Sequence, residues 1–304
     1  MSTVLSAKRI ANCQTYFLKE WAILLLSLGK IRISLLVTLS TATGYLLAAQ
    51  EVTLQMFVPA AAVFLLACGS CALNQYQERR IDGFMERTRN RPLPSGKLNP
   101  SFALFISLGL ISAGSFILFH AVSLLAGILG LFAIFWYNGI YTYLKRKTAF
   151  AAIPGALIGA IPPTLGWTSG GGSLLDPRIW AVILFFFMWQ VPHFWLLLLD
   201  FGEDYEKAGL PALTRIFTPA QLRRITFMWI CATAVSCMMI QLFSIVDSLT
   251  IRGGLFIAAF WLVWKGSKLL KVRSPGLPFH FTFNTINSYA FVVMVLFTLD
   301  KLFH

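Results

Sequence analysis

Long apolar stretches that contain no Asp, Glu, Lys or Arg dominate the chain. They cover residues 33–50, 52–77, 98–144, 149–175, 179–199, 225–246 and 274–299. A helix needs about 20 mostly apolar residues to cross a bilayer, so each stretch predicts a membrane span. The stretch at 98–144 is long enough for two spans joined by a tight turn near His120. The pattern therefore predicts eight transmembrane helices.

A ninth span is expected across residues 248–264, although Arg252 and the pair Gly253–Gly254 interrupt its apolar pattern. The predicted fold class is an all-α polytopic membrane protein with about nine transmembrane helices. We expect residues 1–304 to form a single membrane-embedded domain. Within it, residues 1–29 form an N-terminal segment, and residues 78–100 and 200–224 form two polar loops.

The composition agrees with this pattern and excludes a soluble protein. Hydrophobic residues make up 57% of the chain and charged residues only 12%, and the mean hydropathy is +0.72. A soluble core of this length would need a much more polar surface to cover it. The lipid bilayer is therefore the expected environment of the chain.

The basic residues are divided very unevenly between the two sides of the predicted membrane. Of the 25 Lys and Arg residues, only Arg178, Arg252 and Lys301 fall on one side. Because basic loops stay in the cytoplasm, the N-terminus is expected to be cytoplasmic and, with nine spans, the C-terminus outside. The net charge of +13 is spread over short loops, which argues against nucleic acid as a partner.

Acidic residues gather in the two polar loops. Seven of the twelve acids lie there, and Asn74, Glu78 and Asp82 follow one another at i, i+4 and i+8 on one helix face. Asp200 and Asp204 repeat the i, i+4 spacing. Oxygen ligands on one side of the membrane suit Mg²⁺ held by carboxylates and substrate phosphates. The alternative is that these are ordinary loop acids that form salt bridges with neighbouring arginines.

A basic segment follows the first acidic row directly. Residues 86–97 contain Arg87, Arg91 and Lys97 beside prolines, and arginine side chains match the oxygens of a phosphate group. Carboxylates and cations at one mouth of a helical bundle suggest a diphosphate bridged by Mg²⁺, with an apolar tail between the helices. The simpler alternative is that these charges only orient the protein in the membrane.

The residues around these rows resemble the first signature of the intramembrane UbiA-type prenyltransferases, and several further segments resemble the protoheme IX farnesyltransferase (heme O synthase) branch of that superfamily. The first signature is Asn74-x-x-x-Glu78-x-x-x-Asp82 with Arg87-Thr88 and Arg91-Pro92-Leu93-Pro94. The further segments are Tyr141-Thr142-x-x-Lys145-Arg146-x-Thr148, Gly159-Ala160-x-Pro162-Pro163-x-x-Gly166-Trp167, Pro192-His193-Phe194-Trp195 and Asp204-Tyr205-x-x-Ala208-Gly209-x-Pro211. Glu78 departs from the aspartate usual in the superfamily, and Asp200 is more typical of the quinone branch.

The resemblance implies nine helices around a cavity and an Mg²⁺-dependent enzyme that transfers a farnesyl group from farnesyl diphosphate to protoheme IX. It assigns roles to three groups of side chains. The catalytic metal ligands would be Asn74, Glu78, Asp82, Asp200 and Asp204. The diphosphate would be bound by Arg32, Arg87, Arg91, Lys97, Lys145 and Arg146. The heme-binding candidates are His193, Trp195, Tyr141 and Tyr205.

Two of these assignments carry further expectations. Asp82 and Asp204 are expected to face water and metal, so that replacing either would stop the reaction without disturbing membrane insertion. His193 lies about two helical turns from Asp200, where it could ligate heme iron or bond to a propionate. The alternative for His193 is a packing role as a hydrogen-bonding residue between helices.

The resemblance also implies a location and partners. The enzyme would lie in a bacterial cytoplasmic (inner) membrane rather than the mitochondrial inner membrane, with its active site on the cytoplasmic side. Heme A synthase or terminal oxidase assembly factors would receive its product. Two other functions stay open: a prenyltransferase that acts on an aromatic acid for quinone synthesis, and a cation-coupled transporter with intramembrane acids.

Overall fold

The computed structural model describes residues 19–271 and 279–303, and these residues form helices without any strand. Nine helical segments in this part of the chain are long and apolar enough to cross a membrane. They are Ile31–Ala49, Leu54–Asp82, Pro100–Val122, Leu124–Leu144, Ala149–Ser169, Pro177–Lys207, Pro219–Leu242, Leu249–Lys271 and Phe279–Phe303. The predicted all-α membrane fold is confirmed, and the span interrupted by Arg252 is one of the nine.

Most spans contain one long helix, and several contain a shorter helical piece at an end. The helices are α2 (Ile31–Ala49), η1 (Leu54–Met56), α3 (Phe57–Asp82), α4 (Pro100–Ile117), η2 (Leu118–Val122), α5 (Leu124–Ile134), η3 (Phe135–Tyr141), α6 (Thr142–Leu144), η4 (Ala149–Ala151), α7 (Ala152–Gly155), α8 (Leu157–Ser169), α9 (Pro177–Lys207), η5 (Leu213–Arg215), α10 (Pro219–Leu242), α11 (Leu249–Gly266), η6 (Ser267–Lys271) and α12 (Phe279–Phe303). The predicted turn after His120 lies at Ser123, which caps α5.

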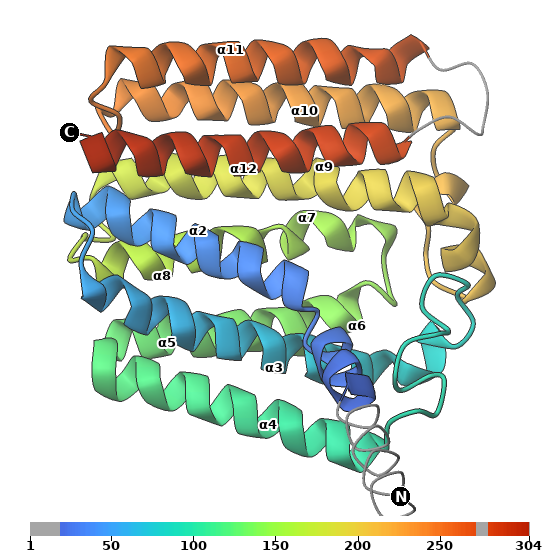
Figure 1. Cartoon of the computed structure of the whole chain (residues 1–304). Helices are drawn as coiled ribbons and strands as arrows, with labels where there is room; N and C mark the ends of the chain where they lie inside the picture. The colour runs from blue at the N-terminus through green and yellow to red at the C-terminus, as the bar shows by residue number, and fades with distance from the viewer. Residues whose placement is uncertain (1–18, 272–278, 304) are drawn as a thin grey trace, which may run out of the picture.

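The spans run side by side and alternate in direction, so α3 and α9 end at the same end of the bundle (Figure 1). We call this end the polar mouth; α2, α4, α10 and α12 begin there. The segments 78–100 and 200–224, which were expected to be loops, begin as helix: α3 continues to Asp82 and α9 to Lys207. Both acidic rows therefore stand on extensions of membrane helices, and the helix backbone sets their direction.

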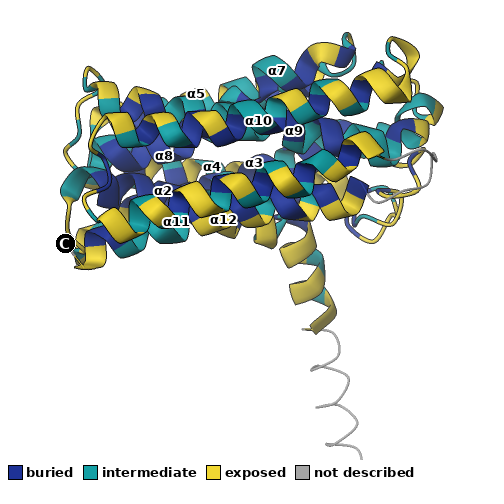
Figure 2. Ribbon diagram, turned by 90° about the horizontal axis from the view of Figure 1, so that it is seen from above, coloured by how far each residue is buried: buried dark blue, intermediate teal, exposed yellow. Residues whose placement is uncertain are grey.

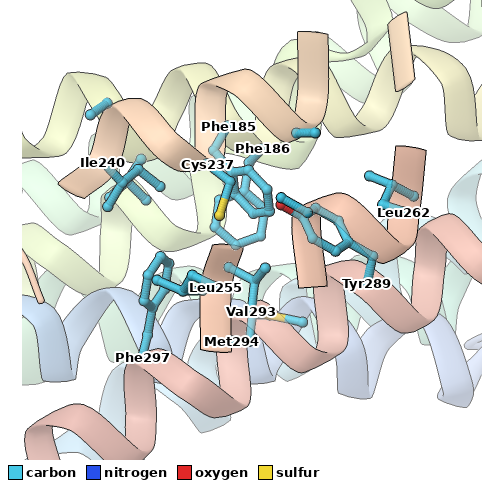
Figure 3. Close-up of a cluster of buried hydrophobic side chains, with 14 of the residues drawn as sticks. Phe185, Phe186, Cys237, Ile240, Leu255, Leu262, Tyr289, Val293, Met294 and Phe297 are labelled. Carbon is cyan, nitrogen blue, oxygen red and sulfur yellow. The ribbon is translucent and has the colours of Figure 1, made fainter. Parts of the chain in front are cut away.

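Burial follows the position of each residue in the bundle. Figure 2 shows exposed residues on the outer faces of the helices and buried residues between them. Residues 19–28 form a helix that projects sideways from the bundle in the same view. The largest apolar cluster joins α9, α10, α11 and α12 and includes Phe185, Leu255, Tyr289 and Phe297 (Figure 3). This cluster packs the four C-terminal spans against one another.

Two glycines allow α2 and α8 to pack very closely. A Cβ atom on Gly44 would lie 2.0 Å from the carbonyl oxygen of Pro163, and one on Gly166 would lie 1.9 Å from that of Thr41. Small residues permit such close packing between helices in lipid, where apolar side chains gain little from leaving the solvent. This close contact holds α2 against the centre of the bundle, together with Lys30, the residue that precedes the helix.

Candidate functional site at the polar mouth

The first acidic row is almost completely buried at the end of α3. Glu78 is 4% exposed and Asp82 1% exposed, so the expectation that Asp82 faces water was wrong. The loop after α3 folds back over the helix end and covers the carboxylate. Lys145 Nζ lies 2.5 Å from Glu78 Oε1, and Arg91 donates to Asp82 Oδ2 at 2.7 Å. Asp82 Oδ1 is buried and has no hydrogen-bond partner among the described residues.

A polar seam between α3 and the segment η3–α6 supports this row. We define the seam as Ser70, Asn74, Gln77, Asn138 and Thr142. Asn138 donates to the carbonyl of Ser70 at 3.0 Å and to Gln77 Oε1 at 3.2 Å, and Asn74 donates to Thr142 Oγ1 at 3.1 Å. Buried polar groups are costly without partners, so these bonds determine how the two helices pack together.

The fourth span, which packs against the end of α3, has a wider helix in the part that contributes Asn138 to the seam. Residues Phe135–Tyr141 form a π-helix, η3, within the fourth span. Such π-bulges occur often at functional sites because they re-aim side chains. Here the bulge places Asn138 toward α3, and Thr142, just after it, donates to the carbonyl of Tyr137 at 2.9 Å. The same segment carries Lys145 to Glu78.

Lys30 lies beside the first acidic row, and the sequence analysis gave it no role. It precedes α2 with φ 46° and ψ 55°, a left-handed conformation that is uncommon outside glycine, and its ammonium donates to Asn74 Oδ1 at 3.4 Å. Desolvation lowers the pKa of Lys30, and the positive charges of Arg91 and Lys145 lower it further. Backbone strain of this kind often marks a functional position. The only sequence signal is a lysine placed directly after Gly29.

The second acidic row lies on a distorted and more accessible helix end. Phe201 has φ −121° and ψ 23°, which kinks α9 between Asp200 and Asp204. His280 Nε2 lies 3.4 Å from Asp200 Oδ2, and the backbone N–H of Arg87 donates to Asp204 Oδ2 at 3.2 Å. The loop after α3 therefore contacts both rows, through Arg91 and Arg87, and brings them to the same mouth.

The structure brings some of the predicted diphosphate ligands to the mouth and leaves others at its edge. Lys145, Arg91 and Arg87 contact the acidic rows, as described above. Arg146 lies beside them and donates to the carbonyl of Gln77 at 3.0 Å. Arg32 and Lys97 are exposed, and their side chains make no ion pair or hydrogen bond within residues 19–271 and 279–303. Lys30 contacts Asn74 of the first acidic row, whereas Arg32, two residues further along, makes no such contact.

A row of aromatic rings runs from the seam toward α12, deeper in the bundle than the acids. Tyr137 stacks on Tyr141 with centroids 5.9 Å apart, and Tyr141 stacks on Phe194 at 5.4 Å. His193 follows at 5.7 Å from Phe194. Lys145 Nζ lies 5.7 Å from the Tyr141 centroid, so Tyr141 joins the aromatic row to the first acidic row.

The other predicted heme-binding residues lie apart from this row. Trp195 is buried and packs edge-on against Trp229 at 5.9 Å, on the side of α9 that faces α10. Tyr205 is half-buried next to Asp204. The sequence analysis missed Phe194, which contacts Tyr141 in place of its neighbour Trp195. The phase of α9 decides between the two rings, and the motif Pro192-His193-Phe194-Trp195 alone does not reveal it.

The acids do not form a metal centre by themselves in the described part of the chain, where no three His, Cys, Asp or Glu side chains converge closely enough to hold an ion. The donor set nevertheless fits Mg²⁺ that is shared with a ligand. Its atoms are oxygens, and Asp82 Oδ1 is buried without a partner. Mg²⁺ is usually bound by one or two carboxylates together with substrate phosphates.

The nine-span bundle has the fold of known intramembrane prenyltransferases. A digeranylgeranylglyceryl phosphate synthase superposes with a TM-score of 0.73 at 15% identity, covering 93% of this chain and 99% of that protein. A UbiA homolog from Archaeoglobus fulgidus bound to GPP and Mg²⁺ gives a TM-score of 0.69 at 14% identity, over 91% and 99% of the two chains. These likenesses establish the fold class.

Sequence similarity then identifies the family. The chain belongs to the UbiA prenyltransferase family, whose model matches residues 37–287. A protoheme IX farnesyltransferase from Oleidesulfovibrio alaskensis is 33% identical over 276 residues, which are 91% of this chain and 95% of that protein. One from Geobacter sulfurreducens is 39% identical over 72% of this chain and 81% of that protein.

Proposed function

We propose that this enzyme transfers a farnesyl group from farnesyl diphosphate to a vinyl group of protoheme IX and so forms heme O and diphosphate. The observation that carries the proposal is the meeting of two acidic rows and several cations at one mouth of a membrane bundle. The similarity to protoheme IX farnesyltransferases over 91% of the chain supports the choice of acceptor.

The polar mouth would bind the diphosphate. Lys30, Arg91 and Lys145 lie close to the first row, and Arg87 lies beside the second. The proposed Mg²⁺ ligands are the oxygens of Asn74, Glu78, Asp82, Asp200 and Asp204. Bound Mg²⁺ would neutralise diphosphate oxygens and stabilise the negative charge of the leaving group. An incoming diphosphate would take over cations that now pair with Glu78 and Asp82.

The reaction balances with one water molecule. The bond between farnesyl C1 and the diphosphate oxygen breaks, and diphosphate leaves with the electron pair. The vinyl π electrons of protoheme form the new bond to farnesyl C1, which leaves a positive charge on the vinyl carbon next to the porphyrin ring. Water adds its oxygen to that carbon and releases a proton, which gives the hydroxyethylfarnesyl group.

The aromatic row suits both the cation and the acceptor. Ring faces attract positive charge, and Tyr141 lies between the cation Lys145 and the deeper ring of Phe194. Flat aromatic side chains also stack on planar conjugated molecules. We therefore assign the space beside Tyr141 and Phe194 to the allylic cation and the edge of the porphyrin, and His193 to the porphyrin itself.

The proposal includes a location. The bacterial relatives and the charge distribution support a cytoplasmic (inner) membrane with the polar mouth and the N-terminus on the cytoplasmic side. Soluble farnesyl diphosphate would then reach the acids from the cytoplasm, and protoheme would enter from the lipid. The product would pass to heme A synthase or to proteins that assemble a terminal oxidase.

The test is product formation in membranes that contain the full chain, supplied with protoheme, farnesyl diphosphate and Mg²⁺. Mass analysis of extracted hemes should reveal heme O, and EDTA should abolish it. Transfer only to hydroxybenzoate or dihydroxynaphthoate would instead assign the enzyme to quinone synthesis. Failure with all of these acceptors would favour transport, although the acids lie at one end of the bundle and not at the midplane typical of transporter sites.

A further inference from the structure

A hydrogen bond joins His193 of α9 to Asn287 of α12. His193 Nδ1 and Asn287 Oδ1 are 2.7 Å apart. The two residues are far apart in the sequence, and Asn287 belongs to none of the segments to which the sequence analysis gave a role. Trp189, one turn earlier on α9, donates to the carbonyl of Ile286 at 3.1 Å. The two helices are therefore held in register at this level of the bundle.

The partner of Nδ1 determines which ring nitrogen carries the proton. A carbonyl oxygen can only accept, so Nδ1 must be the donor and must carry the hydrogen. In a neutral imidazole the other nitrogen, Nε2, then has a free lone pair. His193 makes no hydrogen bond through Nε2 within the described residues and is only half-buried. An unprotonated Nε2 is thus available to a ligand.

The rings around His193 suit a flat partner. Phe283 lies 4.8 Å from the imidazole centroid, Trp189 5.2 Å and Phe194 5.7 Å. Phe194 continues into the aromatic row that leads to the first acidic row. Because helices rise 1.5 Å per residue, the imidazole lies about 10 Å below Asp200 along α9. A porphyrin contacting His193 would therefore have an edge within reach of the polar mouth.

We propose that Asn287 is a positioning residue that keeps His193 in the Nδ1–H tautomer, so that Nε2 can coordinate the iron of the porphyrin substrate. The inference rests on the proposed function. Metal-bound histidines usually donate their other ring N–H to an oxygen acceptor, which fixes the ring and raises its basicity. The Asn287 carbonyl supplies that acceptor from the last helix of the bundle.

Protoheme binding by the purified full chain tests this role without relying on turnover. Titration with ferric protoheme should produce an imidazole-ligated absorption spectrum in the wild type. His193→Ala should lose it, and added imidazole should restore it. Asn287→Leu should weaken protoheme binding about 10- to 100-fold and change the spectrum. Asn287→Asp should preserve both, because a carboxylate also accepts from Nδ1–H.

A matched control removes another hydrogen bond to the same helix. Thr233 donates to the carbonyl of Met188 at 2.9 Å between α10 and α9, so Thr233→Val should leave the protoheme spectrum unchanged. If Asn287→Leu keeps the wild-type spectrum and affinity, or Asn287→Asp fails as Asn287→Leu does, the positioning role is overturned. If the Asn287 variants fail in either of these ways but the wild type still forms heme O, only the positioning role is lost and the proposed function stands. A wild type that forms no heme O overturns both proposals.

Discussion

The two acidic rows differ in how firmly the protein holds them. Glu78 and Asp82 are buried on a regular helix, where Lys145 and Arg91 pair with them and the polar seam supports α3. Asp200 and Asp204 are half-buried on either side of the kink at Phe201. Their partners are the exposed side chain of His280 and a backbone N–H of a loop.

This difference indicates a division of labour at the mouth. A buried carboxylate on a regular, packed helix keeps its position when a charged ligand arrives, even where its paired cation turns toward that ligand. An accessible carboxylate on a kinked end can move with the loop that contacts it. We infer that the first row forms the fixed side of the diphosphate site and the second row its adjustable side. Three pairs of substitutions test the mouth, and a single substitution at the opposite end of the bundle serves as their control.

The largest expected effect is on activity, and both rows should show it. Asp82→Asn and Asp204→Asn should each reduce prenyl transfer by about 10²- to 10³-fold, because each removes charge stabilisation of the departing diphosphate. Product should be measured by mass and normalised to inserted protein. Near-normal activity in either variant would remove that residue from the metal-ligand assignment.

The next effect should distinguish the two acidic rows by how much a substitution in each lowers the free energy of unfolding. Glu78→Gln leaves the ammonium of Lys145 without its partner in a mostly buried site, which should cost about 3 kcal/mol. Asp200→Asn loses an interaction with a largely exposed histidine and should cost less than about 1 kcal/mol. Thermal unfolding in one detergent compares the two. Equal losses would contradict the distinction between a fixed and an adjustable side.

A third pair tests which cation near α2 binds the diphosphate. Lys30→Gln should weaken farnesyl diphosphate binding by about 2 kcal/mol, since hydrogen bonds to charged groups contribute this much, or roughly 30-fold. Arg32→Gln, two residues away and exposed, is the matched control and should bind normally. The KM for farnesyl diphosphate reports both. The reverse result would support the diphosphate role that the sequence analysis gave to Arg32.

The smallest effect on activity should come from a substitution at the opposite end of the bundle, which serves as the control for the others. Asp176 caps α9 by accepting from the backbone N–H of Arg178 at 2.9 Å, and the side-chain hydrogen bond from Arg178 lowers the Asp176 pKa. Asp176→Ala should cost about 1 kcal/mol and leave activity per folded enzyme unchanged.

The lowered pKa also predicts how this capping contribution depends on pH. A depressed carboxyl pKa adds stability that is fully present above the unfolded value near 3.9. That stability is lost as the pH falls through the lower pKa of the folded state. The stability difference between wild type and Asp176→Ala should therefore shrink only in strong acid. A difference that already shrinks near neutral pH would rule out Asp176 as its source.

The sequence alone predicted the spans and the general chemistry of the mouth. Seven apolar stretches, one of them long enough for two spans, and the interrupted segment 248–264 specify nine helices, because a backbone in lipid must satisfy its own hydrogen bonds. On such a helix, the i, i+4 spacing of Asn74, Glu78 and Asp82 places them on one face, because the helix repeats every 3.6 residues. These properties depend on local periodicity and length, which the sequence contains directly. The resemblance to a family added the prenyl donor and the acceptor.

Only the tertiary structure decided which side chains meet. Asp82 is buried because the loop after α3 turns Arg91, nine residues further along the chain, back onto it, and Lys30 reaches Asn74 through a left-handed backbone. The pairing of His193 with Asn287 depends on how α9 packs against α12. Each of these contacts joins residues that no local pattern relates, because helix packing and loop closure, and not helical periodicity, bring them together.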